Sequence, residues 1–72
     1  MPVPMFPVTS SNISFIGYDD ETQELYIRFH NDSVYKYSDV PELVFSELRN
    51  STSVGKYYLN NIKGKYESIK IN

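Results

Sequence analysis

The sequence predicts an α+β domain in which a three-stranded antiparallel meander is followed by two helices packed on one face of the sheet. Residues 13–37 contain three short runs of β-branched and aromatic residues, separated by polar segments. From residue 39 onward the apolar residues recur at the spacing of a helix. Strands followed by helices are typical of a sheet that helices cover on one side.

The first nine residues are expected to form an extended, proline-rich lead-in. Pro2, Pro4 and Pro7 exclude a helix there and favour either polyproline II or the edge of a sheet. Residues 10–72 then make one domain, because a chain of 72 residues cannot supply two hydrophobic cores.

Three strands are expected, at Ile13–Tyr18, Glu24–His30 and Ser33–Tyr37. A polar loop joins the first two, and Asn31-Asp32 suits a tight hairpin turn between the second and third, because both residues tolerate positive φ.

The middle strand alternates strictly, which predicts its two faces. Its buried face carries Leu25, Ile27 and Phe29, and its other face carries Tyr26, Arg28 and His30. The third strand adds either Tyr35 and Tyr37 or Val34 and Lys36 to that exposed face, depending on a register that the sequence does not fix.

Asp39, followed by Glu42 three residues later, predicts the N-cap of the first helix, with Pro41 in its first turn. Val40, Val44 and Leu48 recur every fourth residue, with Phe45 beside them, and predict its buried stripe. Thr52 or Ser53 is expected to cap a second helix, whose buried side would carry Tyr58, Leu59, Ile62 and, as a further candidate, Tyr66. The alternation in residues 68–71 predicts a short C-terminal strand.

Composition excludes several classes of site. The absence of cysteine rules out disulfides, and with a single histidine it also rules out a Cys/His zinc site, so we expect no metal and no cofactor. The core must depend on packing, to which seven tyrosines and four phenylalanines contribute.

The same sequence bears on location and partners. No apolar run approaches the ~20 residues of a membrane span, and the N-terminal residues lack the basic segment of a secretory signal, so a cytoplasmic protein without membrane contact is expected. The net charge of −2 disfavours nucleic acid. Residues 55–72, however, carry four lysines against one glutamate, and this quarter of the chain is locally basic.

From about Val8 to Tyr66 the chain resembles the KTSC domain, which occurs at the C-terminus of some lysyl-tRNA synthetases and as free-standing bacterial and phage proteins. The residues that carry the resemblance are Val8, Ser10, Ser11, Ile13, Ile16, Gly17, Tyr18, Asp19, Leu25, Phe29, Tyr35, Lys36, Tyr37, Val40, Pro41, Leu48, Ser53, Gly55, Tyr57, Ile62 and Tyr66. Two residues depart from the family pattern, Asp32 in place of the usual Gly and Leu59 in place of a frequent Asn. The resemblance implies a compact domain without catalytic activity, for which RNA binding has been suggested.

Two candidate surfaces for nucleic acid follow. One is the exposed strand face, where tyrosines beside basic side chains can stack unpaired bases. The other is the turn into the second helix, where free backbone N–H groups and lysines can meet phosphate, although the turn lacks the pattern of a P-loop. The candidate residues are Arg28, Tyr35, Lys36 and Tyr37 on the strands, and Ser53, Gly55, Lys56, Tyr57, Lys63 and Lys65 in and after the turn. The competing interpretation is structural: tyrosines that pack beneath a helix, a serine that caps and a glycine that permits close packing.

A catalytic triad of His30, Asp32 and Ser33 is the weaker interpretation, because turn chemistry explains these residues and the chain is too short to build a reaction pocket readily. The sequence therefore predicts a binding module and not an enzyme. Its first candidate partner is single-stranded RNA or another nucleic acid. The alternative is a protein-interaction module that docks through an edge strand or an aromatic patch on a host protein or on a second copy in a homodimer.

Overall fold

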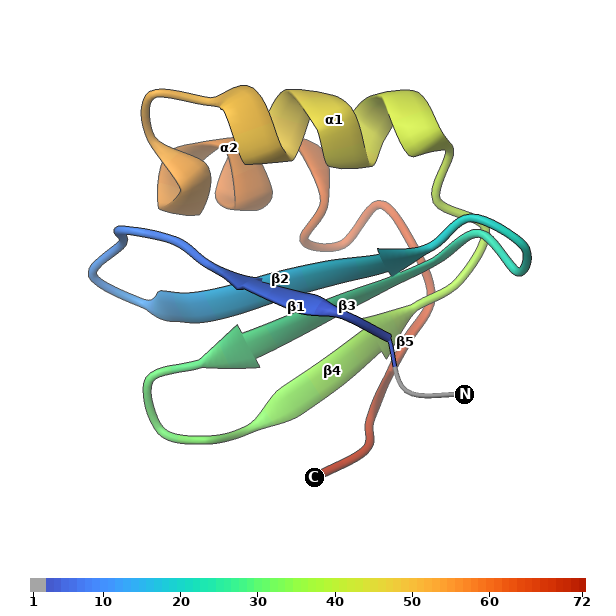
Figure 1. The fold of residues 1–72 in the computed structure, drawn as a ribbon, viewed down its shortest axis with the longest axis horizontal. Helices are drawn as coiled ribbons and strands as arrows, with labels where there is room; N and C mark the ends of the chain where they lie inside the picture. Colours follow the sequence, from blue (N-terminus) through green and yellow to red (C-terminus); the bar gives the residue numbers. More distant parts are fainter. Residues whose placement is uncertain (1–2) are drawn as a thin grey trace.

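The computed structural model describes residues 3–72 and consists of a five-stranded antiparallel sheet with two helices on one face (Figure 1). The elements in chain order are β1 (Met5–Pro7), β2 (Ile13–Asp19), β3 (Glu24–Phe29), β4 (Val34–Tyr37), α1 (Glu42–Asn50), α2 (Val54–Asn61) and β5 (Ser68–Lys70). The strands lie in the sheet in sequence order. The predicted α+β class is confirmed, and so is the short C-terminal strand.

The lead-in contributes a strand, so the sheet-edge alternative for the prolines is the one that the structure has. Residues 1 and 2 of this segment lie outside the described residues. Phe6 of β1 pairs with Ile16 of β2, and the N–H of Val8 donates to the carbonyl of Ser14. Because successive residues of a strand point their polar groups to opposite sides, the nitrogen of Pro7 faces away from β2, where no donor is needed.

Gly17 allows this close approach of β1. A Cβ atom at Gly17 would lie 2.5 Å from the sulfur of Met5 and 2.7 Å from the backbone carbonyl oxygen of Pro4. The backbone cannot move aside as a flexible side chain can, so any side chain here would push the edge strand away from β2.

The register of β3 and β4 decides which tyrosines are exposed. Ile27 pairs with Tyr35 and Leu25 with Tyr37, and residues directly opposite one another share a face. Tyr35 and Tyr37 therefore face the helices. The outer face instead carries the alternating set, in which Tyr26 lies opposite Lys36.

The core lies between the helices and this inner face of the sheet. Its buried residues are Ile13, Ile16, Leu25, Ile27, Tyr37, Val40, Phe45, Leu48, Val54, Tyr58 and Ile62. Tyr18 adds a polar tie at its border, because its ring stacks on Phe45 at 5.1 Å while its hydroxyl donates to the carbonyl of Val40.

The predicted N-cap of the first helix is wrong. Pro41 is the N-cap residue of α1, and Asp39 has a positive φ of 57°. A residue that precedes proline avoids the helical region, so Val40 stays out of the helix and its N–H donates to Gln23 instead. Ser53 does occupy the N-cap position of α2, although its side chain makes no capping hydrogen bond.

The second helix ends earlier than the sequence suggests. Ile62 is the C-cap residue of α2, and Gly64 follows with a positive φ of 77°. Tyr66 therefore lies beyond the helix, where it packs half-buried against the core.

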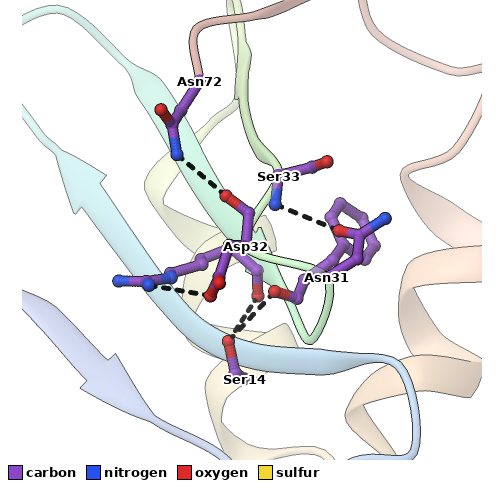
Figure 2. A network of polar contacts seen from close by, with 7 residues as sticks. Ser14, Asn31, Asp32, Ser33 and Asn72 are labelled. Atoms are coloured by element: carbon purple, nitrogen blue, oxygen red, sulfur yellow. Dashed lines mark hydrogen bonds and ion pairs between the residues drawn. The ribbon is translucent and has the colours of Figure 1, made fainter.

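The β3–β4 turn is the predicted Asn31-Asp32 hairpin, and a network of polar contacts fixes it (Figure 2). Asp32 has a positive φ of 69° and forms a 2.9 Å ion pair with Arg28. The side-chain amide of Asn72 donates to the carbonyl of Asp32, and the backbone N–H of Ser33 donates to the side chain of Asn31. The network ties the C-terminal residue to a turn that faces α2 across a cleft.

Candidate ligand-binding cleft

A hollow opens between α2, the β1–β2 loop and the β3–β4 turn, to judge from the residues that line it. Figure 1 shows these three segments near one end of the sheet. The volume of the hollow is about 690 Å³, within the usual range for ligand pockets. The lining residues are Ser11, Asn12, Ile13, Phe29, His30, Asn31, Ser33, Tyr35, Tyr37, Gly55, Tyr58, Leu59, Lys63, Gly64 and Ser68. We call this hollow the cleft.

Four aromatic rings line the inner part of the cleft. Phe29 packs in an edge-to-face manner on Tyr35, with centroids 5.7 Å apart, and on Tyr58, with centroids 5.6 Å apart. Tyr37 packs edge-on against Tyr58, and their hydroxyl oxygens are 2.6 Å apart. Since Phe29 and Tyr35 are only half-buried, part of this aromatic cluster is available to a ligand.

A second, shallower hollow continues from the cleft along the start of α2. It shares four lining residues with the cleft, and Ser53 and Lys56 belong to it alone. Gly55 lies where the two meet, and a Cβ atom there would come within 3.0 Å of the hydroxyl of Ser10. That hydroxyl accepts hydrogen bonds from the backbone of Asn12 and Ile13, which fix the shape of the β1–β2 loop where it lies close to α2.

Charge is distributed unequally over the described residues. The linings of the cleft and of the second hollow include Lys56, Lys63 and His30 but no aspartate or glutamate. A third hollow contains the acidic side chains of the β2–β3 loop and the first turn of α1, namely Asp19, Asp20, Glu21 and Glu42. The excess of negative charge therefore lies away from the cleft.

The structure brings some of the predicted site residues together and separates others. Tyr35, Tyr37, Gly55 and Lys63 line the cleft, and Ser53 and Lys56 line the second hollow beside it. Lys65 is exposed just beyond α2 but lines neither.

Arg28 and Lys36 lie on the opposite face of the sheet and are engaged there. Arg28 forms the ion pair with Asp32, and its guanidinium lies 5.9 Å from the ring centre of Phe15. Lys36 contacts Glu24 at 3.2 Å, and this hydrogen bond is the main cause that lowers the pKa of Glu24. Arg28 and Lys36 therefore do not form one binding surface with Tyr35 and Tyr37, because the sheet lies between the two pairs.

Sequence reasoning missed several cleft residues as parts of a site. The sequence predicts Phe29, Tyr58 and Leu59 on buried faces, and His30 on the outer strand face or in a triad. The prediction for Leu59 is wrong, because this residue is 53% exposed at the cleft. The ring of His30 instead turns toward the β1–β2 loop, where Nε2 donates to the carbonyl of Ser10 at 2.7 Å. The alternation correctly predicts that Phe29 lies on the inner face of the sheet. Whether a residue of this face lies in the core or in the cleft depends on the position of α2.

Two side chains of the hypothetical triad have other partners. His30 bonds to Ser10 and Asp32 to Arg28, while Ser33 contributes its backbone N–H to the turn. Nor do the residues from 3 to 72 gather three or more side chains of the His, Cys, Asp and Glu type into a metal site. None of the helices in this part of the chain is both long and apolar enough to span a membrane.

Tyr57 points away from the cleft and joins the two helices. Its hydroxyl donates to the carboxylate of Glu47 at 2.7 Å, and burial, followed by this hydrogen bond, raises its pKa to about 12. Tyr57 therefore has a structural contact that the sequence did not reveal.

This contact predicts a loss of stability in alkali. A tyrosine whose pKa is higher in the folded state holds its proton more tightly there, so its contribution is complete below the ordinary tyrosine pKa of 10.0 and is lost as the pH rises toward about 12. We expect the urea-unfolding free energy of wild type to fall more steeply across this window than that of Tyr57→Phe. Parallel curves for the two proteins would contradict the role given to the Tyr57–Glu47 contact.

Comparison with known proteins gives consistent matches over most of the chain. The family model of the KTSC domain matches residues 9–66. A lysine–tRNA ligase from Trichormus variabilis is 42% identical over 65 residues, a match that covers 86% of this chain but 12% of the ligase. A protein from Tsukamurella paurometabola is 34% identical over 67 residues, which cover 93% of this chain and 100% of that protein.

A solved structure agrees with the fold. The crystal structure of a KTSC domain protein from Yersinia pestis superimposes with a TM-score of 0.95 at 35% identity, covering 99% of this chain and 100% of that one.

Proposed function

Because the chain belongs to the KTSC domain family, we propose that it is a non-catalytic domain that binds single-stranded nucleic acid, RNA above all, in the cleft beside α2. The observation that carries the proposal is the joint lining of the cleft and the second hollow, which brings an aromatic cluster together with Lys63 and Lys56 and includes no carboxylate. Unpaired bases stack on aromatic rings, and lysines meet the phosphates that follow the bases along the strand.

The distribution of charge removes the main objection to this proposal. The net charge is −2, but a polyanion responds to the local field. Four of the nine acidic residues line the third hollow, none lines the cleft, and Asp32 in the neighbouring turn is paired with Arg28. Lys56 and Lys63 are both exposed: Lys63 lines the cleft and Lys56 the second hollow, and the two hollows share Gly55 and Leu59. A strand laid along this path would place phosphates near both lysines.

The similarity to the ligases supports RNA as the nucleic acid. A region that resembles most of this chain occurs in proteins whose name states that they join lysine to a tRNA. The shared region is a small part of each ligase, so the support concerns the class of ligand and not the ligase reaction.

The proposal predicts that Lys56→Gln/Lys63→Gln binds single-stranded RNA roughly 10-fold more weakly than wild type at low salt. Each lysine that meets a phosphate contributes about 0.7 to the slope of log affinity against log salt, so the slope should become shallower by about 1.4. Fluorescence anisotropy of a labelled oligouridylate over a salt series measures both quantities.

The matched control is Leu43→Glu/Ser46→Glu, with two substitutions on the exposed side of α1. Each pair of substitutions lowers the formal net charge from −2 by two units, so the control tests whether overall charge explains the result. The control should retain most of the binding. If wild type shows no salt-dependent affinity at micromolar concentration, the proposed function is wrong.

A protein-interaction module is the second candidate, and the outer face of the sheet favours it. No helix covers this face (Figure 1), where Phe15 and Tyr26 are half-buried and Ile69 is 56% exposed. If wild type does not bind RNA and its mass in solution doubles as the protein concentration rises, a homodimer through this face is favoured. If the control and the lysine variant lose RNA binding equally, overall charge explains the loss, and the result does not support the cleft as the site.

A further inference from the structure

Tyr37 and Tyr58 form a buried pair of hydroxyl groups in the cleft. The two oxygens are 2.6 Å apart, and the residues are only 3% and 9% exposed. Tyr37 comes from the inner face of β4 and Tyr58 from α2, so the pair joins the two walls of the cleft. Within the aromatic cluster it is the one pair of hydroxyl groups that are hydrogen-bonded to each other.

One proton of this pair lacks an acceptor among residues 3–72. Each phenol carries one proton, and the bond between the two hydroxyls uses one of the two. Neither hydroxyl makes another hydrogen bond with the described part of the chain. Whichever tyrosine donates within the pair, its partner keeps a proton and a lone pair at the cleft.

Burial favours the neutral form of Tyr37. The pKa of Tyr37 is raised well above its ordinary value, first by burial and then by the hydrogen bond with Tyr58. At neutral pH the pair therefore offers both a donor and an acceptor. The direction of the bond between them can also reverse, so the free donor can sit on either residue.

We infer that the Tyr37–Tyr58 pair hydrogen-bonds the edge of a single unpaired nucleobase that enters the cleft and packs against the ring of Phe29. This inference rests on the proposed function and adds its ligand contact. A base is flat enough to lie against Phe29, and its edge presents the carbonyl or ring-nitrogen acceptor that the free proton lacks. Leaving a buried donor without a partner is costly, which favours a ligand that supplies one.

The test uses two labelled oligonucleotides of equal length, one of uridines and one in which difluorophenyl nucleosides replace the uridines. The analogue keeps the shape and stacking of uracil but is a very poor hydrogen-bond partner. Wild type should prefer the uridine oligomer by about 2- to 10-fold, the gain expected from one neutral hydrogen bond.

Tyrosine variants assign this preference to the pair. Tyr37→Phe/Tyr58→Phe should bind both oligomers with equal affinity. Each single variant keeps one hydroxyl that can donate to the base, so each should retain much of the preference. Loss of the preference only in the double variant separates a ligand contact from a role in folding, which would affect both oligomers alike.

Three results would overturn the inference. Equal affinity of wild type for both oligomers would show that no base edge is read, and a double variant with the full preference would place the contact elsewhere. In either case RNA binding, and with it the proposed function, would remain intact. Failure of wild type to bind either oligomer would overturn both proposals. Thermal unfolding of each variant identifies the temperature at which all are folded, and if the double variant is unstable the wild-type comparison of the two oligomers still tests the inference.

Discussion

The double variant Phe29→Leu/Tyr35→Leu is expected to bind single-stranded RNA about 5- to 100-fold more weakly than wild type, because stacking on an aromatic ring contributes about 1–3 kcal/mol per base. Both rings line the cleft and are half-buried. Leucine keeps much of the apolar volume but has no ring face, so the substitutions remove stacking with limited loss of packing.

Phe15→Leu is the matched control for this experiment. Phe15 is also half-buried on a strand, but its partner in the sheet is Arg28, which places it on the outer face. The control should leave the affinity unchanged within about twofold. If Phe15→Leu weakens binding as much as the double variant does, the ligand lies on the outer face, and the cleft is not the site.

Ile27→Ala is expected to lower the free energy of unfolding by about 2–5 kcal/mol. Ile27 is fully buried on β3, the middle strand of the sheet, so the cavity left by its side chain is enclosed on both sides. A domain of 72 residues has a total stability of only roughly 4–11 kcal/mol, and the variant should be partly unfolded at physiological temperature.

Urea denaturation followed by circular dichroism measures this loss. Leu43→Ala is the control, because Leu43 is 67% exposed on α1 and its removal should cost less than about 0.5 kcal/mol. A loss below 1 kcal/mol for Ile27→Ala would mean that the core is not organised around β3.

The buried face of a strand can be predicted from the sequence wherever apolar and polar side chains alternate. Leu25 and Ile27 alternate with polar residues, and both are fully buried where the pattern predicts. Asn31-Asp32 was readable as a turn because few residue types tolerate its backbone. Asp39 gave a wrong N-cap for α1, because the capping-box pattern takes no account of the restriction that Pro41 places on the backbone of Val40.

The cleft is harder to predict from the sequence, because its lining depends on the strand register and on the position of α2. A shift of one residue between β3 and β4 exchanges Tyr35 and Tyr37 for Val34 and Lys36, and no local signal selects between them. The candidate set consequently mixed residues from both faces of the sheet. The inner wall also draws Tyr58 from α2, some twenty residues after β4, and such a contact exists only once the chain is packed.

The proline in β1 limits how this protein can polymerise. Exposed edges of sheets are templates on which strands of other molecules can add, and this addition is the first step toward fibres. At one edge, Pro7 leaves a gap in the row of donors that an incoming strand would need. Strand-by-strand growth is thereby directed to the other edge, where β5 offers only three residues and ends in a lysine.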